Sequence, residues 1–334
     1  MLDSERSHGK YGTTLAVSGM AMLMAAFLPA PACAQAWPTK PLRFIMAAPA
    51  GSSIDVLGRL LAERMRLSLG QSIVVENLPG AGGTLATAAV AKASADGHTL
   101  GIAFNGPLAF APYLFGRLAY DPARDLTPII LTTSQPNVLA VTGGIAPRTV
   151  RELVDYAKAQ AGRLNYASVG NGSSSHLTME LFKSMAGIDL AHVPYNGSPP
   201  ALNALANGDV HVVFAVPTAI TPLAQAGKVR MLAVSGATRW TLLPDLPAVA
   251  ESGLPGFEAM AWNGVIAPAG VATDVVARLN VVLDTALRDP AVAARLKASG
   301  LEPVGGSPAD FAALIRIEAE KWAPIIRRTG VKID

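Results

Sequence analysis

The 334-residue chain contains a single cysteine, Cys33, which lies near its N-terminus. One cysteine excludes both a framework of intrachain disulfides and a structural zinc site built from several thiolates. Cys33 also falls inside an N-terminal segment that we expect to be removed. The mature protein is therefore predicted to have no disulfide, no thiol nucleophile and no thiolate metal ligand.

Charged residues are also scarce, at 15% of the chain, and aromatic residues make up only 6%. The net charge is +3, and no run of lysine and arginine with interleaved aromatic residues occurs, so nucleic-acid binding has no support. Hydrophobic residues reach 51%, with 31 glycines and 25 prolines. This composition is typical of a compact α/β protein with many loops and not of a disordered chain. The slight positive balance suits an anionic ligand.

The usual arrangements of catalytic and metal-binding residues are missing as well. His98, His176, His192 and His211 are scattered without the spacing of metal ligands. There is no G-x-S-x-G nucleophile motif and no Gly-Lys-Ser/Thr phosphate loop, and Gly80–Leu85 has leucine where the third glycine of a dinucleotide-binding motif belongs. The missing motifs therefore favour binding over catalysis and argue against a metal site.

An uncharged apolar segment, Thr13–Leu28, is the most informative feature of the N-terminus. It is followed by Ala32-Cys33-Ala34 and Ala34-Gln35-Ala36, which both fit the A-x-A rule for signal-peptide cleavage. Its length of about 16 residues is short for a membrane span, which needs about 20. We predict that residues 1–36 are a cleaved signal peptide and that the mature protein is exported. Lipid attachment to the cysteine is the alternative, although Ala30 stands where a larger aliphatic residue is usual.

Downstream of this segment, strand-like apolar runs alternate with Gly-rich loops and amphipathic helices. This repetition with short connections predicts parallel sheets with helices on their faces, the α/β class. Two such blocks are joined by stretches rich in alanine, glycine and proline. We predict one domain from residues 37–141 plus 260–334 and a second from residues 142–259. Because ligands of open α/β sheets bind at the carboxyl ends of strands, loops from both blocks could converge on one cleft.

The stretch NYASVGNGSSSH, Asn165–His176, carries the clearest binding signal. It is typical of a strand, a Gly-rich loop and three serines at the start of a helix. The unpaired N–H groups and the dipole of such a helix end bind anions without a formal positive charge. Alternatively, Ser173–Ser175 only cap the helix. A third interpretation pairs Ser173 with His176 as a hydrolase, but the sequence places no orienting acid beside them.

Seven blocks, spread in order over the predicted mature chain, carry a family resemblance. They are PAGSSIDVLGRLLAERM at 49–65, VENLPGAGG at 75–83, ADGHTLGIA at 95–103, YDPARDLTPI at 120–129, YASVGNGSSSHLTMELF at 166–182, HVPYNGSPPALNALANGDVHVVF at 192–214 and LPAVAESGLPGFEAMAWNGVIAPAGV at 246–271. Together they resemble the tripartite tricarboxylate transporter substrate-binding proteins, also called the Bug family. The resemblance implies a two-domain, periplasmic-binding-protein-like fold of type II, in which each domain is a central sheet flanked by helices and the ligand cleft lies between them.

The resemblance also implies a function. Members are periplasmic receptors that close their two domains on a small, usually carboxylated, ligand. The resemblance therefore implies a protein that is not an enzyme and uses no cofactor. One carboxylate would be held by backbone amides and ordered waters between Ala50–Ser53 of the first domain and Gly170–Ser175 of the second. The candidate ligand-binding residues are Ala50, Gly51, Ser52, Ser53, Asp55, Asn105, Ser168, Gly170, Gly172, Ser173, Ser174, Ser175, Asn196 and Thr218.

Three details of the candidate loops modify this expectation. Ser52 stands where the family usually has a second glycine, so its side chain should narrow the pocket or add a hydroxyl contact. Asp55 falls in the first turn of its helix, where a negative charge is favourable without any ligand. Because the candidate loops contain no arginine or lysine, we expect a monocarboxylate or an aromatic carboxylate in preference to citrate.

The partners follow from the same resemblance. A receptor of this family would act as a monomer and deliver its carboxylate ligand to integral membrane permease subunits made of other chains. The alternative is a sensor, in which the ligand-bound receptor docks on the ectodomain of a signalling protein. The sequence of the receptor does not separate these two roles.

Overall fold

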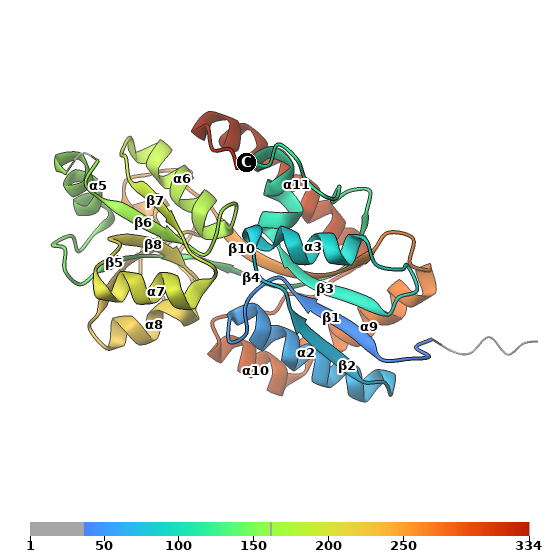
Figure 1. The fold of residues 1–334 in the computed structure, drawn as a ribbon. Helices are drawn as coiled ribbons and strands as arrows, with labels where there is room; N and C mark the ends of the chain where they lie inside the picture. Colours follow the sequence, from blue (N-terminus) through green and yellow to red (C-terminus); the bar gives the residue numbers. More distant parts are fainter. Residues whose placement is uncertain (1–36, 161, 334) are drawn as a thin grey trace, which may run out of the picture. The chain divides into compact units, whose positions relative to one another are not determined.

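The computed structural model describes residues 37–160 and 162–333. The predicted signal peptide, residues 1–36, lies outside the described residues. Within the described part, no helix is both long and apolar enough to span a bilayer. Residues 40–333 contain two five-stranded sheets, each covered by helices (Figure 1). We call the first sheet with its helices the first lobe, and the second sheet with its helices the second lobe.

The first sheet has the strand order β2-β1-β3-β10-β4. Its strands are β1 (Leu42–Met46), β2 (Ile73–Asn77), β3 (Thr99–Phe104), β4 (Leu126–Pro136) and β10 (Met260–Pro268). Strand β1 pairs in parallel with β2 and β3, whereas β10 runs antiparallel to both β3 and β4. The inner strands are nearly continuous apolar runs because helices cover both of their faces.

Helices lie on both faces of the first sheet (Figure 1). On one side are α2 (Ser53–Leu69), α9 (Thr273–Arg288) and α10 (Pro290–Ala298), and on the other are α3 (Thr84–Ala91) and α11 (Pro308–Thr329). Three short helical segments, η2 (Ala81–Gly83), η3 (Gly106–Phe110) and α4 (Ala111–Leu114), belong to the connections. Helix α2 buries Leu57, Leu61 and Met65, which are four residues apart and therefore share the stripe that faces the sheet.

The second sheet has the strand order β7-β6-β8-β5-β9. Its strands are β5 (Val138–Thr142), β6 (Asn165–Ser168), β7 (Ala191–Pro194), β8 (Val212–Ala215) and β9 (Val229–Val234). Helices α5 (Val150–Ala159) and α6 (Ser174–Ala186) cover one face, and α7 (Ser198–Asn207) and α8 (Pro217–Gln225) cover the other (Figure 1). The short turn η4 (Ala250–Ser252) follows β9. Strand β6 is parallel to β7 and β8, and β5 is antiparallel to β8 and β9.

The prediction of purely parallel sheets is wrong, because one strand in each sheet runs against the others. These strands are β10 in the first sheet and β5 in the second. Both belong to the two crossings between the lobes. The chain leaves the first sheet through β4, continues directly into β5, and later returns as β10. A strand that continues from the other lobe does not arrive through a helical crossover, so nothing imposes the parallel direction on it.

Asn137 is the single residue between β4 and β5, and it ties the outgoing crossing to the returning one. Its backbone N–H donates to Ser235 Oγ at 2.8 Å, and the Ser235 N–H donates back to Asn137 O at 2.8 Å. Ala259 N in turn donates to Ser235 O at 2.8 Å, just before β10. The two crossings therefore form one hydrogen-bonded joint. Strand pairing assigns all of β5 to the second sheet, although the first predicted domain boundary, at residue 141, falls inside this strand. The predicted domain boundaries themselves stay a prediction.

Candidate functional site

A cavity lies between the two lobes. Its lining comes from the loops that follow β1, β2, β3, β6, β7 and β8, and from the places where β4 and β10 cross between the sheets. The space open to the centres of water molecules is about 110 Å³. This is enough for several waters or for a small organic molecule. The cavity thus occupies the position at which open α/β sheets bind ligands.

The loop from β1 to α2 presents two free backbone amides to this cavity. Ser52 caps α2 with an extended backbone, φ −74° and ψ 165°, and its hydroxyl accepts a hydrogen bond from Asp55 N at 3.3 Å. The N–H groups of Ser53 and Ile54 find no acceptor in the described part of the chain, and both residues line the cavity. The first turn of α2 can therefore donate two hydrogen bonds to a bound anion.

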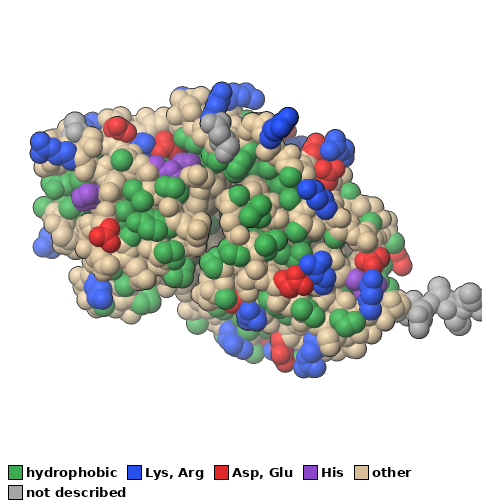
Figure 2. All heavy atoms as spheres, in the orientation of Figure 1, with side chains coloured by type: hydrophobic (Ala, Val, Ile, Leu, Met, Phe, Trp, Pro, Cys, Tyr) green, Lys and Arg blue, Asp and Glu red, His purple; other side chains and the backbone are tan. Residues whose placement is uncertain are grey.

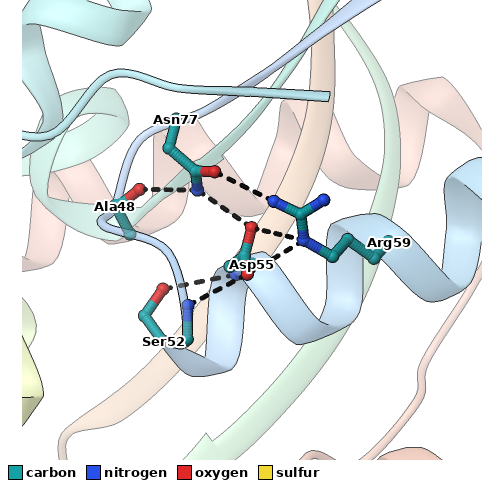
Figure 3. A network of polar contacts seen from close by, with 6 residues as sticks. Ala48, Ser52, Asp55, Arg59 and Asn77 are labelled. Atoms are coloured by element: carbon teal, nitrogen blue, oxygen red, sulfur yellow. Dashed lines mark hydrogen bonds and ion pairs between the residues drawn. The ribbon is translucent and has the colours of Figure 1, made fainter. Parts of the chain in front are cut away.

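Asp55 holds this loop in shape from behind (Figure 3). Its side chain is only 6% exposed. It accepts hydrogen bonds from Gly51 N at 3.0 Å, Asn77 Nδ2 at 2.9 Å and Arg59 Nε at 3.0 Å. Asn77 Nδ2 also donates to Ala48 O at 3.0 Å, which ties β2 to the end of β1. Burial alone would raise the pKa of Asp55, but these hydrogen bonds outweigh it and lower the pKa below its ordinary value.

The loop from β6 to α6 presents a second pair of free amides. Ser173 caps α6 with φ −72° and ψ 164°, and its hydroxyl accepts from His176 N at 3.4 Å. The N–H groups of Ser174 and Ser175 donate to no acceptor among the described residues, and both residues line the cavity. Two helix N-termini, one from each lobe, therefore bring two unpaired amides each to the lining of the same cavity.

The three serine hydroxyls of the second loop have different partners. Ser173 Oγ donates to Gly170 O at 2.6 Å, and Ser175 Oγ lies 3.1 Å from Ser173 Oγ. Because the Ser173 proton goes to Gly170, the proton between the two hydroxyls comes from Ser175. Ser174 Oγ accepts from Asn137 Nδ2 at 2.9 Å, so its own proton is left for a ligand. Of these three hydroxyls, only that of Ser174 is free to donate.

Two stacked histidines support the second loop from behind. The ring centroids of His176 and His192 are 4.0 Å apart, and Tyr166 stacks on His192 at 4.7 Å. His176 Nδ1 accepts from Gly172 N at 3.0 Å, and His192 Nε2 lies 2.7 Å from Ser168 Oγ. Burial lowers the pKa of His176 to about 3 and the pKa of His192 to about 4, so both rings are neutral at pH 7.

Ser173 and His176 are not arranged as a nucleophile and its base. The hydrogen bond between them joins the backbone N–H of His176 to Ser173 Oγ and does not involve the imidazole. The Nδ1 of that ring is occupied by Gly172 N, and the Ser173 proton is occupied by Gly170 O. A hydrolase needs the ring nitrogen to take the hydroxyl proton, and this geometry does not provide that transfer.

Among the described residues that line the cavity, none carries a charge. On the face drawn in Figure 2, hydrophobic and other uncharged side chains border the hollow between the lobes, and charged ones lie further out. Positive potential in the cavity therefore comes from the N-termini of α2 and α6. Within residues 37–160 and 162–333, no group of three or more His, Cys, Asp or Glu side chains could hold a metal ion.

Uncharged side chains from the crossing strands complete the wall. Phe104 and Trp262 supply aromatic surface, and Gln135, Asn137 and Asn263 supply carboxamides. Asn263 Nδ2 donates to a threonine of β4 at 2.9 Å, which leaves its oxygen as an acceptor. A ligand bound through the four amides would therefore meet aromatic faces and neutral polar groups.

The two lobes touch through glycines at the edge of the cavity. A Cβ atom on Gly82 would lie 2.0 Å from Asn171 O, and one on Gly106 would lie 2.6 Å from Gly172 O. Both contacts join the first lobe to the second. Only a residue without a side chain permits backbone to approach backbone this closely.

The cavity brings together most of the residues expected from the sequence. Eight candidates line it, namely Ser52, Ser53, Asn105, Gly170, Ser173, Ser174, Ser175 and Asn196. Gly51 and Thr218 line a neighbouring cavity that shares Ser52 and Ser53 with the first. Ser52, which stands where the family usually has a glycine, lines both cavities. Contact of any of these residues with a ligand stays a prediction.

The other candidates lie outside the cavity lining. Ser168 is fully buried, and its hydroxyl donates to Gly170 O at 3.2 Å. Gly172 supports the loop through His176, and Asp55 supports the first loop, so these residues position the amides. Ala50 is exposed and lines neither cavity.

Sequence reasoning missed the wall formed by the crossings, including Gln135, Asn137 and Asn263. The expectation placed binding residues in loops at strand ends, whereas these residues lie within or between strands. A signal was present in the run AMAWNGVIAP, where Asn263 interrupts a buried apolar strand. A polar residue in such a run usually has a specific partner or a function.

Comparisons with known proteins identify relatives of this chain. A model of the family described as "Tripartite tricarboxylate transporter family receptor" matches residues 57–331. The UPF0065 protein in the tcbD-tcbE intergenic region of Pseudomonas sp. (strain P51) is 37% identical over 87% of this chain and 87% of its own length. Protein BugT of Bordetella pertussis is 35% identical over 96% of this chain and 98% of its own length.

Solved structures have the same architecture. R. palustris Rpa4515 with adipate has a TM-score of 0.85 and 38% identity, covering 89% of this chain and 99% of that protein. Periplasmic binding protein BugD has a TM-score of 0.83 and 34% identity, covering 89% and 99%. MatC (Rpa3494) of Rhodopseudomonas palustris with bound malate has a TM-score of 0.82 and 34% identity, covering 87% and 100%. These matches confirm the predicted two-domain fold of periplasmic-binding-protein type.

Proposed function

Because this chain belongs to the tripartite tricarboxylate transporter receptor family, we propose that it is a periplasmic solute-binding receptor for a small organic carboxylate. The family is one of substrate-binding receptors, so the chain is not an enzyme. The receptor binds its ligand between the lobes and releases it unchanged. Export to the periplasm would depend on the signal peptide predicted for residues 1–36.

One observation carries this proposal. The free amides of Ser53 and Ile54 on α2 and of Ser174 and Ser175 on α6 border one cavity that contains no charged side chain. A carboxylate has two oxygens, each able to accept two hydrogen bonds, and this matches two pairs of donors from opposite lobes. The dipoles of both helices add to the attraction.

The ligands of related structures support the same class of compound. Rpa4515 was solved with adipate and MatC with malate, and both ligands are small carboxylates. For this chain we assign the carboxylate to the space between the first turns of α2 and α6. The aromatic faces of Phe104 and Trp262 then border the carbon skeleton of the ligand.

We assign capture to closure of the lobes about the joint at Asn137 and Ser235. The backbone contacts of Gly82 with Asn171 and of Gly106 with Gly172 support closure, because they hold the lobes together around the cavity. The closed receptor, a monomer, would then hand its ligand to membrane permease subunits of a tripartite transporter. A ligand that contacts both lobes shifts the equilibrium from the open to the closed form. The size of this shift is set by how much more tightly the ligand binds the closed form than the open one.

Thermal unfolding with a set of carboxylates tests the binding function. A carboxylate at 100 times its dissociation constant should add about 2.7 kcal/mol to the free energy of unfolding. Absence of stabilisation by every mono- and dicarboxylate would reject the proposal.

Proline substitution tests the role of the amides directly. Ser53 and Ser174 are the first residues of their helices, where proline fits the helical backbone and removes the N–H group together with the serine hydroxyl, so Ser53→Ala and Ser174→Ala are measured beside them to report the loss of the hydroxyl alone. We expect Ser53→Pro and Ser174→Pro each to weaken carboxylate binding about 10-fold or more, since a hydrogen bond to a charged group is lost. Thr273→Pro, at the exposed first position of α9, is the matched control and should leave affinity unchanged. Unchanged affinity in both serine-to-proline variants would contradict the assigned carboxylate site.

A further inference from the structure

The neighbouring cavity, which Gly51 and Thr218 line, adjoins the cavity that holds the four free amides. The two cavities share Ser52, Ser53, Ser198 and Val216 in their linings. In the neighbouring cavity the space open to the centres of water molecules is about 360 Å³, against about 110 Å³ in the first. The assigned carboxylate site therefore lies beside room for a larger ligand than the first cavity alone could hold.

Both lobes build the walls of the neighbouring cavity. The first turn of α2 forms one side, and the first two turns of α7 and α8 form the other. At one end, where Ser299 lines the cavity, backbone of the first lobe approaches the second, since a Cβ atom on Gly300 would lie 2.8 Å from Thr218 N. A ligand that reaches into this space contacts both lobes, as its carboxylate does, and so favours the closed form.

The walls of the neighbouring cavity are largely apolar. In the part of the chain that the structure describes, no charged side chain lines it. The apolar lining side chains larger than alanine are Val56, Pro199, Leu202, Val216, Pro222 and Leu223. Such a surface binds hydrocarbon because the contact removes apolar area from water.

The helix starts on the α7 and α8 side carry prolines, whereas α2 and α6 carry free amides. Helix α7 begins with Ser198-Pro199-Pro200, and α8 begins with Pro217. Proline has no N–H group, so these starts have fewer donors and more carbon than those of α2 and α6. The donors suited to an anion are thus concentrated on α2 and α6, and the surface suited to carbon lies on α7 and α8.

We propose that the neighbouring cavity is a subsite for the hydrocarbon part of the ligand, which extends from the carboxylate past Ser53 and Val216 to α7 and α8. This inference rests on the receptor function proposed above and specifies the ligand class. The ligand is a carboxylate with an apolar chain or an aromatic group several carbons away from the carboxyl carbon. Phe104 and Trp262 border the part of the skeleton nearest the carboxylate, and the neighbouring cavity receives the rest.

Two series of acids test the length of the ligand by calorimetry on the mature protein. One series runs from butanoate through hexanoate to octanoate, and the other from benzoate through 3-phenylpropanoate to 4-phenylbutanoate. In at least one series the longest acid should bind about 10-fold or more tightly than the shortest, because its added carbons enter apolar surroundings. We call this ratio the length gain. A length gain below 10-fold in both series would overturn the proposal.

The variant Ala219→Phe tests the place of the chain by filling the neighbouring cavity. Ala219 lies in the first turn of α8 and is partly buried, so a phenylalanine here occupies the space assigned to the hydrocarbon. The length gain should fall to about 2-fold or less. Ala294→Phe, at an exposed position of α10 outside the lining of both cavities, is the matched control and should keep the full length gain.

The variant Val56→Asn tests the apolar wall without filling the cavity. Val56 is exposed on α2, so the polar side chain is tolerated, and this variant keeps the test open if Ala219→Phe does not fold. The length gain should fall about 3-fold or more. Leu67→Asn, exposed on the same helix and outside both linings, should leave it unchanged. An undiminished length gain in either Val56→Asn or Ala219→Phe would place the chain elsewhere and overturn the proposal.

The same titrations separate this inference from the function on which it rests. If neither these acids nor any other carboxylate binds the wild type, the receptor function fails. If the short acids bind as tightly as the long ones, the receptor function stands and only the hydrocarbon subsite fails.

Discussion

The two loops that face each other across the cavity have nearly the same backbone but different supports. Ser52 and Ser173 cap their helices with φ and ψ that agree within a few degrees, −74° and 165° against −72° and 164°. Each cap is followed by two unpaired amides that border the cavity. Behind the first loop lies the ionised Asp55, bound by Arg59. Behind the second lie neutral hydroxyls and imidazoles.

This difference shows that the anion-binding geometry resides in the backbone. A capped helix start orients its first amides in the same way whether a charge or a set of neutral groups holds the preceding loop. The support decides how the loop responds to mutation and to pH. The first loop depends on one carboxylate with several donors, and the second divides the same task among Ser168, Ser175 and His176.

The largest effect is expected from Asp55→Asn. The amide cannot accept from Gly51 N, Asn77 and Arg59 together, and it removes the charge that strengthens those hydrogen bonds. We expect the free energy of unfolding to fall by about 3 kcal/mol, the worth of hydrogen bonds to a charged group. Carboxylate affinity should fall about 10-fold or more, because the amides of Ser53 and Ile54 lose their orientation. Urea denaturation and calorimetry measure the two losses.

A matched control separates this role from a general loss of charge. Asp289 caps α10 and is partly exposed, and asparagine is an equally good N-cap. Asp289→Asn should therefore change stability by less than about 0.5 kcal/mol and leave affinity unchanged. Equal effects of the two variants would show that Asp55 does not position the first loop.

The second loop should be the more sensitive to mild acid. The pKa of His176 is about 3 in the folded protein and about 6.5 when unfolded, so only the unfolded chain takes up the proton between these values. Stability should fall as the pH drops, by about 2 kcal/mol between pH 7.5 and 5 for this residue. Asp55, whose pKa is lowered, keeps its charge throughout this range. The stability that Asp55 contributes through the first loop is lost only as the pH falls below the ordinary pKa range of carboxyl groups.

Urea denaturation at pH 7.5 and pH 5 checks this asymmetry. The variant His176→Asn retains an acceptor for Gly172 N but cannot titrate. Its loss of stability between the two pH values should be about 2 kcal/mol smaller than that of the wild type. A variant with the full wild-type loss would show that His176 does not cause the acid sensitivity.

Both loops could be predicted from the sequence because their signals are local. Glycines and serines before an amphipathic helix specify a capped start within a few residues of chain. The predicted strand, Gly-rich loop and helix start at Asn165–His176 match β6 and the beginning of α6, which Ser173 caps. Family resemblance then paired the two loops across one cleft, which neither loop indicates by itself.

The wall of the cavity could not be predicted in the same way, because it depends on contacts between distant parts of the chain. Gln135 and Ala261 are register partners in β4 and β10, and only the folded sheet brings them together. Helix α8 (Pro217–Gln225) is another element that the sequence analysis does not predict, and it contains two prolines. Pro217 occupies the first turn, where proline is tolerated, and Pro222 lies inside the helix.

The smallest effect is expected from Ser174→Ala. This variant distinguishes a hydroxyl that binds the ligand from one that stabilises the second loop. The Ser174 proton is the one hydroxyl donor of Ser173–Ser175 left free, so its removal should weaken carboxylate binding about 10-fold, or about 1.4 kcal/mol. Stability should change by less than about 0.5 kcal/mol, because Asn137 keeps Thr178 within 3.5 Å. Ser173→Ala should instead lower stability by about 1 kcal/mol through loss of the N-cap. Calorimetry and urea denaturation on both variants test this division, and the same profile in both would mean that the three hydroxyls act as one unit.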